Sequence, residues 1–439
     1  MLQEKLKLVW ASDMSSNRNA ARGTRPLVGR ARKAPANASH IMANCDSTHV
    51  IAAYAGLGPV KNFSDVLDQS AQLAPAKCLA AEQVIHMAES WRYLSSAMFA
   101  LLNNESGNAI HLAYYCELRA ALSLFCGSGL RIDRDNGFWI DSAGTMHRLG
   151  DHRTHSFAWK AWTEWVKRSD ARGLLENSVR LLPSVTLKDF EPQLKQFDPT
   201  LMLSGWGLDL IRLKDDHETR NSVSYTAYWR SQPLIKMSAE KLEFIKSLSG
   251  MFLSSGSGLI FDRALVQYLV SSTLSSSIPA SDPPTDQQIE ARKEELNKIV
   301  SFVAKQTGAD EVTMAEHLSA NVGVSIFEKA SDEADKVENV MARAAFMARL
   351  AMLFVKSHIS LSRDENAKQW MRNWLESCGR WEPMGGAALE DLESDLNEAI
   401  DHFPAFSADM PASLWRGENL PHSTSLANLH ACIAWGVAA

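Results

Sequence analysis

Residues 79–125 decide the fold class, and they have the sequence LAAEQVIHMAESWRYLSSAMFALLNNESGNAIHLAYYCELRAALSLF. Apolar side chains recur every three or four positions in the first half, which is the spacing of one face of an α-helix. These side chains are Val84, Met87, Trp91, Leu94 and Met98. Polar residues and Gly107 interrupt the pattern before a second helix, expected over 109–125, and Gly127 and Gly129 end that helix in the usual way. The two helices predict a helical bundle.

The rest of the chain is also expected to be mainly helical, with one small β-hairpin or meander. Asn136-Gly137 is a strong hairpin signal between the short apolar segments 130–133 and 138–141, and a third segment follows over 145–149. Further helices are expected over 156–168, from Asp198-Pro199 onward, and over 288–305, 331–359, 365–378, 388–402 and 425–437. Ser331, Asp332 and Glu333 are predicted to cap the long helix over 331–359.

Four segments are expected along the chain. A basic flexible arm covers 1–40, and a helical bundle carrying the hairpin near 130–150 covers 41–270. A Ser/Pro-rich linker covers 271–286, and a second helical domain covers 287–439. The predicted fold class is therefore mainly α.

Composition excludes several classes of protein. The chain has 439 residues, of which 46% are hydrophobic and 22% charged, so it is neither a disordered chain nor a coiled-coil rod. The most membrane-like stretch, 344–359, contains Arg349 and Lys356, so no membrane span is expected. The six cysteines form no CxxC pair, which argues against a zinc knuckle or a disulfide framework and favours reduced thiols in a cytoplasm.

The net charge of −6 hides a basic N-terminal arm. Residues 1–40 contain two acidic side chains, Glu4 and Asp13, and eight basic ones, Lys5, Lys7, Arg18, Arg22, Arg25, Arg30, Arg32 and Lys33. The arm is interpreted as a tail without a role, a phosphate-contacting segment, or a targeting peptide or misassigned start. If the arm alone binds nucleic acid, its deletion will abolish salt-dependent binding.

Two segments together resemble the HEPN (higher eukaryotes and prokaryotes nucleotide-binding) superfamily of helical bundles. The first is LAYYCELRAALSL over 112–124, with the paired Tyr114 and Tyr115 that begin one helix of the family. The second is LIRLKDDHETRNSVSYTAYW over 210–229, with an Arg-Asn pair. The resemblance implies a bacterial toxin or phage-defence protein. Active members are metal-independent endoribonucleases whose site is completed across a homodimer.

The resemblance implies a site at Arg220, Asn221 and Tyr225, where the family has Arg, Asn and His; Tyr228 matches its trailing Tyr. An arginine would stabilise the charge on a scissile phosphate. A phenol with an ordinary pKa near 10 is a poor base at neutral pH, so Tyr225 weakens the case for catalysis. The nearest imidazole, His217, is the alternative that reaches the site from the other direction.

Each of these residues also has a structural interpretation. Arg220 is then a surface or capping arginine that pairs with Asp215 or Asp216, and Tyr114, Tyr115 and Tyr228 pack in the core. Arg119 is either a bundle arginine paired with an acid on a facing helix or, together with Arg220, a phosphate clamp.

Two other clusters stand out. Potential metal ligands gather in the loop after the hairpin: His147, Asp151, His152 and His155. Their spacing matches no metal motif, and the interleaved Arg148 and Arg153 favour an anion or RNA contact over a cation. Trp159, Trp162 and Trp165 recur every three residues, which indicates helix packing or, alternatively, a stacking platform for bases.

The sequence thus favours a helical scaffold or nucleic-acid-binding subunit of a defence complex, with protein partners, over an active endoribonuclease. The candidate catalytic residues are Arg220, Asn221 and Tyr225, and the candidate nucleic-acid contacts are Arg119, His217, Tyr228, Arg148 and Arg153. Neither a cofactor nor a metal is expected, since the chain has no Walker A, GxGxxG, HExxH or GxSxG motif.

Overall fold

A computed structural model describes twelve stretches of the chain. They are residues 34–45, 75–150, 154–194, 197–207, 236–256, 258–278, 285–319, 323–332, 336–362, 389–403, 413–415 and 420–437. The predicted helix over 365–378 and residues 1–33 of the basic arm lie outside them, whereas residues 34–40 belong to helix α3 (Ala34–Asn44). The predicted mainly α fold class is confirmed.

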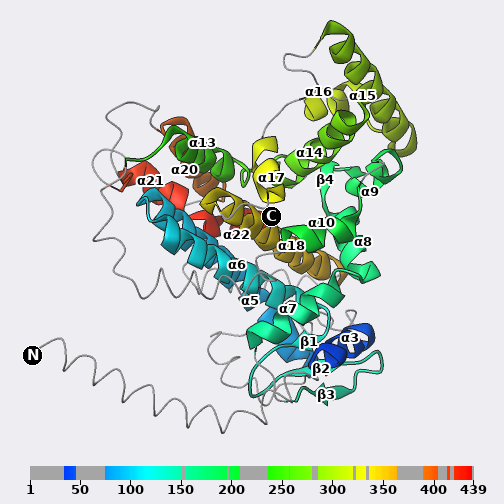
Figure 1. The fold of residues 1–439 in the computed structure, drawn as a ribbon, viewed down its shortest axis with the longest axis vertical. Coiled ribbons are helices and arrows are strands. Elements are labelled where there is room, and N and C mark those ends of the chain that lie inside the picture. Colours follow the sequence, from blue (N-terminus) through cyan, green and yellow to red (C-terminus); the bar gives the residue numbers. More distant parts are fainter. Residues whose placement is uncertain are drawn as a thin grey trace, which may run out of the picture.

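Three long helices form the centre of the molecule (Figure 1). They are α5 (Pro75–Leu102), α6 (Ser106–Gly127) and α18 (Val337–Ser362), and each packs against the other two. The chain reverses between α5 and α6 at Asn104, whose φ of 61° is a left-handed value that asparagine tolerates better than most residues. Lys241 from α13 (Ala239–Gly250) holds this turn by donating to Asn104 Oδ1 at 2.8 Å and to Ser106 Oγ at 2.9 Å.

Helix α18 is the most enclosed of the three. Its residues 337–355 are all buried, and among them are the charged side chains of Glu338, Arg343 and Arg349. The prediction that this helix begins at Ser331 is wrong, because Ser331 ends α17 (Val324–Ser331). The Ser331 hydroxyl donates back to the Glu328 carbonyl at 2.8 Å, so it serves a helix end and not a helix start.

A three-stranded antiparallel sheet follows α6, as the sequence predicts. Its strands are β1 (Leu130–Arg131), β2 (Phe138–Ile140) and β3 (Met146–Arg148), in that order. Asp133 Oδ1 accepts hydrogen bonds from two backbone amides in the first turn, and Asp141 Oδ1 does the same in the second. These aspartate turns set the register, in which Trp139 lies opposite Leu130 on one side and His147 on the other.

The next elements pack beside this central group. They are α7 (Thr154–Trp165), α8 (Ser169–Ser178), β4 (Arg180–Leu182), β5 (Val185–Thr186), α9 (Leu187–Phe190), η2 (Glu191–Gln193) and α10 (Pro199–Trp206). Asp198 caps α10 as predicted, accepting from the amides of Thr200 and Leu201. The small antiparallel sheet of β4 and β5 was not predicted from the sequence.

The later helices complete the core. They are α14 (Ile260–Ser277), α15 (Asp286–Thr307), α16 (Glu311–Ser319), α20 (Leu389–Asp401), α21 (Leu420–Ala427), η6 (Leu429–Ala431) and α22 (Cys432–Val437). Helix α14 runs to Ser277, so the first seven residues of the predicted linker are helical, and residues 279–284 lie outside the described part. The division into two helical domains stays a prediction; α18, from the second of them, packs on α5 and α6 from the first. No described helix is long and apolar enough to cross a membrane.

His358 joins α18 to α5 and is expected to make stability depend on pH. Its side chain is buried, and Nδ1 lies 3.1 Å from Gln83 Oε1. Burial lowers the pKa of His358 to about 4, against an opposing effect of Asp170. Histidine in an unfolded chain has a pKa of about 6.5, so between pH 6.5 and about 4 the unfolded chain binds a proton at this residue and the folded chain does not. The free energy of unfolding therefore falls as the pH drops over this range, by on the order of 3 kcal/mol. Urea unfolding should show a smaller loss over this range in His358→Gln. The exposed His402→Gln serves as control, and an equal loss in both variants would contradict the assignment.

Candidate functional site on helices α5 and α6

Most of the predicted site lies outside the described residues. This applies to Arg220, Asn221 and Tyr225, and also to His217, Tyr228 and Arg153. Arg119 lies on α6 and Arg148 is exposed at the end of β3, opposite Phe138. The two arginines share no hydrogen-bonding partner within the described part of the chain.

Arg119 is held between two side chains of α5. Its Nη1 donates to His86 Nδ1 at 3.1 Å, and its Nε lies 3.9 Å from Glu89 Oε2. The interpretation of Arg119 as a bundle arginine paired with an acid on a facing helix is confirmed. Glu89 also accepts two hydrogen bonds of 3.1 Å from Arg92. Two guanidinium groups therefore share one carboxylate, which leaves one positive charge on this face.

Aromatic rings lie beside the two arginines. Tyr115 stacks on Tyr93 with ring centroids 5.4 Å apart and 23° between the planes, and the His111 ring meets Tyr115 edge-on at 5.1 Å. The Arg92 guanidinium lies 4.9 Å from the centre of the Tyr93 ring. Arg92, Tyr93, His111, Tyr115 and Arg119 are called the tyrosine–arginine face below.

Tyr114, the first tyrosine of the pair, has a different environment. It is buried, and its hydroxyl lies 3.0 Å from His155 Nδ1 on α7. Core packing with a satisfied hydroxyl, the structural interpretation of Tyr114, is confirmed. The paired tyrosines thus serve two purposes, since Tyr114 fixes α7 to α6 while Tyr115 remains half-buried on the tyrosine–arginine face.

A groove of about 460 Å³ begins at this face. Arg92 and His111 belong to both. The polar groups of the groove wall include Ser95, Asn108, His430 and the carboxylate of Glu105. The apolar wall includes Phe99 and Leu112. The volume is within the usual range for small-molecule sites, about 300–1,000 Å³.

The histidine-rich loop does not form one cluster in its described part. His147 Nε2 lies 2.8 Å from Asp141 Oδ2, and its ring stacks on Trp139 at 4.2 Å. His155 instead contacts Tyr114, and Asp151 and His152 lie outside the described residues.

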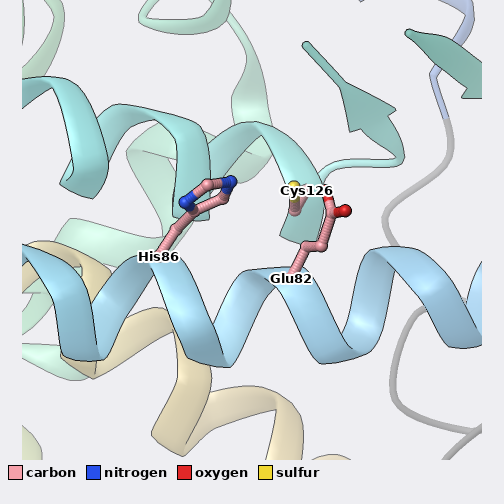
Figure 2. Close-up of side chains that lie close together, drawn as sticks. All are labelled: Glu82, His86 and Cys126. Carbon is pink, nitrogen blue, oxygen red and sulfur yellow. The ribbon is translucent and has the colours of Figure 1, made fainter. Parts of the chain in front are cut away.

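A polar cluster that sequence reasoning missed lies between α5 and α6. Glu82, His86 and Cys126 place their polar atoms within 4.8 Å of one another (Figure 2). Cys78 Sγ lies 3.9 Å from Glu82 Oε1. Arg131 of β1 pairs with Glu82 at 2.6 Å. Cys78, Glu82 and His86 are spaced four residues apart, and this helical spacing is visible in the sequence. Only the fold shows that Cys126 lies beside Glu82 and His86.

Burial and neighbouring charges keep this cluster largely neutral. Burial, with help from Arg119 and Arg131, lowers the pKa of His86 to about 3, so the imidazole is uncharged at neutral pH. Burial, with help from Glu82, raises the pKa of Cys78 to about 12, and burial also raises the pKa of Cys126. The two thiols are therefore protonated when nothing is bound to them.

Comparison with protein-family models, curated proteins and solved structures finds no significant match to this chain. The fold defines a mainly α-helical protein built around α5, α6 and α18. The HEPN resemblance stays a prediction.

Proposed function

We propose that the chain is a HEPN-like nucleic-acid-binding protein that serves as a helical scaffold or RNA-binding subunit of a bacterial defence assembly. The observation that carries the proposal is the tyrosine–arginine face. It lies on α5 and on α6, the helix whose paired tyrosines carry the resemblance, and it combines stacked rings with guanidinium groups next to a groove. Stacked aromatic rings and arginines are the usual platform for single-stranded nucleic acid.

The chemistry of the face suits a single-stranded RNA. A base can stack on Tyr93 or Tyr115, and a stacked base contributes about 1–3 kcal/mol in known single-strand-binding proteins. Arg92 is the more exposed of the two arginines and can turn from Glu89 to a phosphate. Glu105 lines the groove and offsets the surplus positive charge of the face, so stacking is expected to supply most of the affinity.

The test is the binding of a fluorescently labelled single-stranded RNA to the full chain, measured by anisotropy at two salt concentrations. Tyr115→Leu keeps most of the side-chain volume but removes the ring that stacks. Arg92→Gln removes the more exposed cation. Each variant is expected to weaken binding by about tenfold, or roughly 1.4 kcal/mol.

Lys298→Gln is the matched control for Arg92→Gln. Lys298 pairs with Glu295 on α15 at the same spacing as Arg92 with Glu89 on α5, and it is exposed. Its substitution should leave RNA binding unchanged. Absence of binding by the unaltered protein, or an equal loss in Lys298→Gln, would contradict the proposal.

The same mixtures, resolved on a denaturing gel, distinguish binding from cleavage. RNA cleavage that is lost in Arg220→Ala would instead favour the metal-independent endoribonuclease, with Arg220, Asn221 and Tyr225 of two copies forming the site. Light scattering on the same samples tests the homodimer that this mechanism requires.

A further inference from the structure

We propose that Glu82, His86 and Cys126 bind a zinc ion between α5 and α6. Thiolate, imidazole and carboxylate are the three ligand types that zinc takes in proteins, and a water molecule fills the fourth tetrahedral position where the protein supplies three ligands. Figure 2 shows Glu82 and His86 projecting from α5 toward Cys126 near the end of α6. This inference is independent of the proposed RNA binding.

Helix geometry brings the three ligands together. Glu82 and His86 lie at positions i and i+4 of α5 and are therefore neighbours on one face of the helix. Cys126, in the last turn of α6, faces them. Bond lengths of about 2.0–2.3 Å put the ligand atoms of a tetrahedral zinc roughly 3.3–3.8 Å apart. Since the atoms of Glu82, His86 and Cys126 already lie within 4.8 Å of one another, only small side-chain movements are needed.

Arg131 supplies the outer contact that a ligating carboxylate usually has. Its Nε lies 2.8 Å from both oxygens of Glu82, and its Nη2 lies 2.6 Å from Oε1. A carboxylate has about four lone-pair sites, so Glu82 can accept from Arg131 and still bind a metal. Such outer contacts orient the ligand and tune the site.

Arg119 is expected to compete with the metal. It donates to His86 Nδ1, which leaves Nε2 as the imidazole atom available to zinc. When zinc binds Nε2, the imidazole proton lies on Nδ1, which can no longer accept from Arg119. The Cys126 thiol releases its proton to solvent as it binds. Metal binding therefore separates Arg119 from His86 and frees its Nη1.

The test is a titration of the full chain with Co²⁺, followed by displacement with Zn²⁺, in the presence of a phosphine reductant. One equivalent of Co²⁺ should produce the near-ultraviolet thiolate-to-cobalt charge-transfer band and the visible bands of a tetrahedral site, and Zn²⁺ should remove both. Cys126→Ser should remove the charge-transfer band and weaken binding by at least about tenfold. Cys116→Ser is the matched control, because Cys116 is also buried on α6 and contacts the Ala344 carbonyl instead of the cluster.

Arg119→Gln keeps the proposal testable if the cysteine variants fail to fold. Removing the competing cation should tighten Co²⁺ binding by about tenfold, an effect that a purely structural cluster would not produce. No charge-transfer band in the unaltered protein, or a band unchanged in Cys126→Ser, would overturn the site.

Discussion

Asp262→Ala is expected to lower the free energy of unfolding by about 3–5 kcal/mol, because it leaves the Arg349 guanidinium buried without its counterion. Asp262 and Arg349 are each 2% exposed, and two hydrogen bonds between them join α14 to α18. Arg349 Nε lies 3.0 Å from Asp262 Oδ1, and Nη2 lies 2.6 Å from Oδ2. This pair explains how α18 accommodates Arg349 in its buried stretch.

Chemical denaturation of the single and double variants measures this effect. Asp262→Leu combined with Arg349→Met removes both charges and should recover much of the loss, since replacing a buried pair by apolar side chains is often close to neutral. Glu295→Ala is the control, because it breaks the exposed Lys298–Glu295 pair on α15 and should cost less than about 1 kcal/mol. A loss from Asp262→Ala no larger than that of the control would show that Arg349 finds another partner.

Trp165→Ala is expected to have a comparable effect, about 3–5 kcal/mol, because it opens a cavity in a closely packed core. Trp165 is fully buried on α7, and its ring stacks on Trp162 with centroids 5.2 Å apart. Its indole Nε1 donates to Ser128 Oγ at 2.8 Å. Packing, the structural interpretation of the tryptophan stripe, is thereby confirmed for Trp162 and Trp165.

Trp159→Ala provides the comparison on the same helix. Trp159 is half-buried, so its loss should cost clearly less than that of Trp165 in the same denaturation experiment. RNA binding should be unchanged by Trp159→Ala, because the tyrosine–arginine face lies on α5 and α6. Equal destabilisation by the two variants would contradict the assignment of Trp165 to the closed core.

Local signals in the sequence predicted the elements whose form is determined locally. The periodicity of residues 79–125 identified α5 and α6, Asn136-Gly137 identified the hairpin, and Asp198 identified a helix start. Predictions from the sequence were wrong where tertiary packing determines the bounds of a helix. The Ser-rich residues 271–277 continue α14, whose apolar residues pack in the core, and Ser331 ends a helix because α18 starts only when the chain enters the interior.

Only part of the candidate site could be predicted from the sequence. The resemblance identified the helix that carries Arg119 and Tyr115, but their partners Glu89, His86 and Tyr93 come from α5. A single sequence does not state which faces of two helices meet. The Cys78–Glu82–His86 spacing could have been noticed, whereas Cys126 lies 40 residues after His86 and depends on the hairpin of helices.

The position of α18 at the centre has a consequence for biosynthesis. About 210 residues separate the end of α6 at Gly127 from the start of α18 at Val337. The paired helices α5 and α6 therefore leave the ribosome long before the segment that covers them is made. Nascent chains that stop before α18 should expose a broad apolar surface and aggregate or recruit chaperones, so the cell must protect this intermediate until α18 has been synthesised.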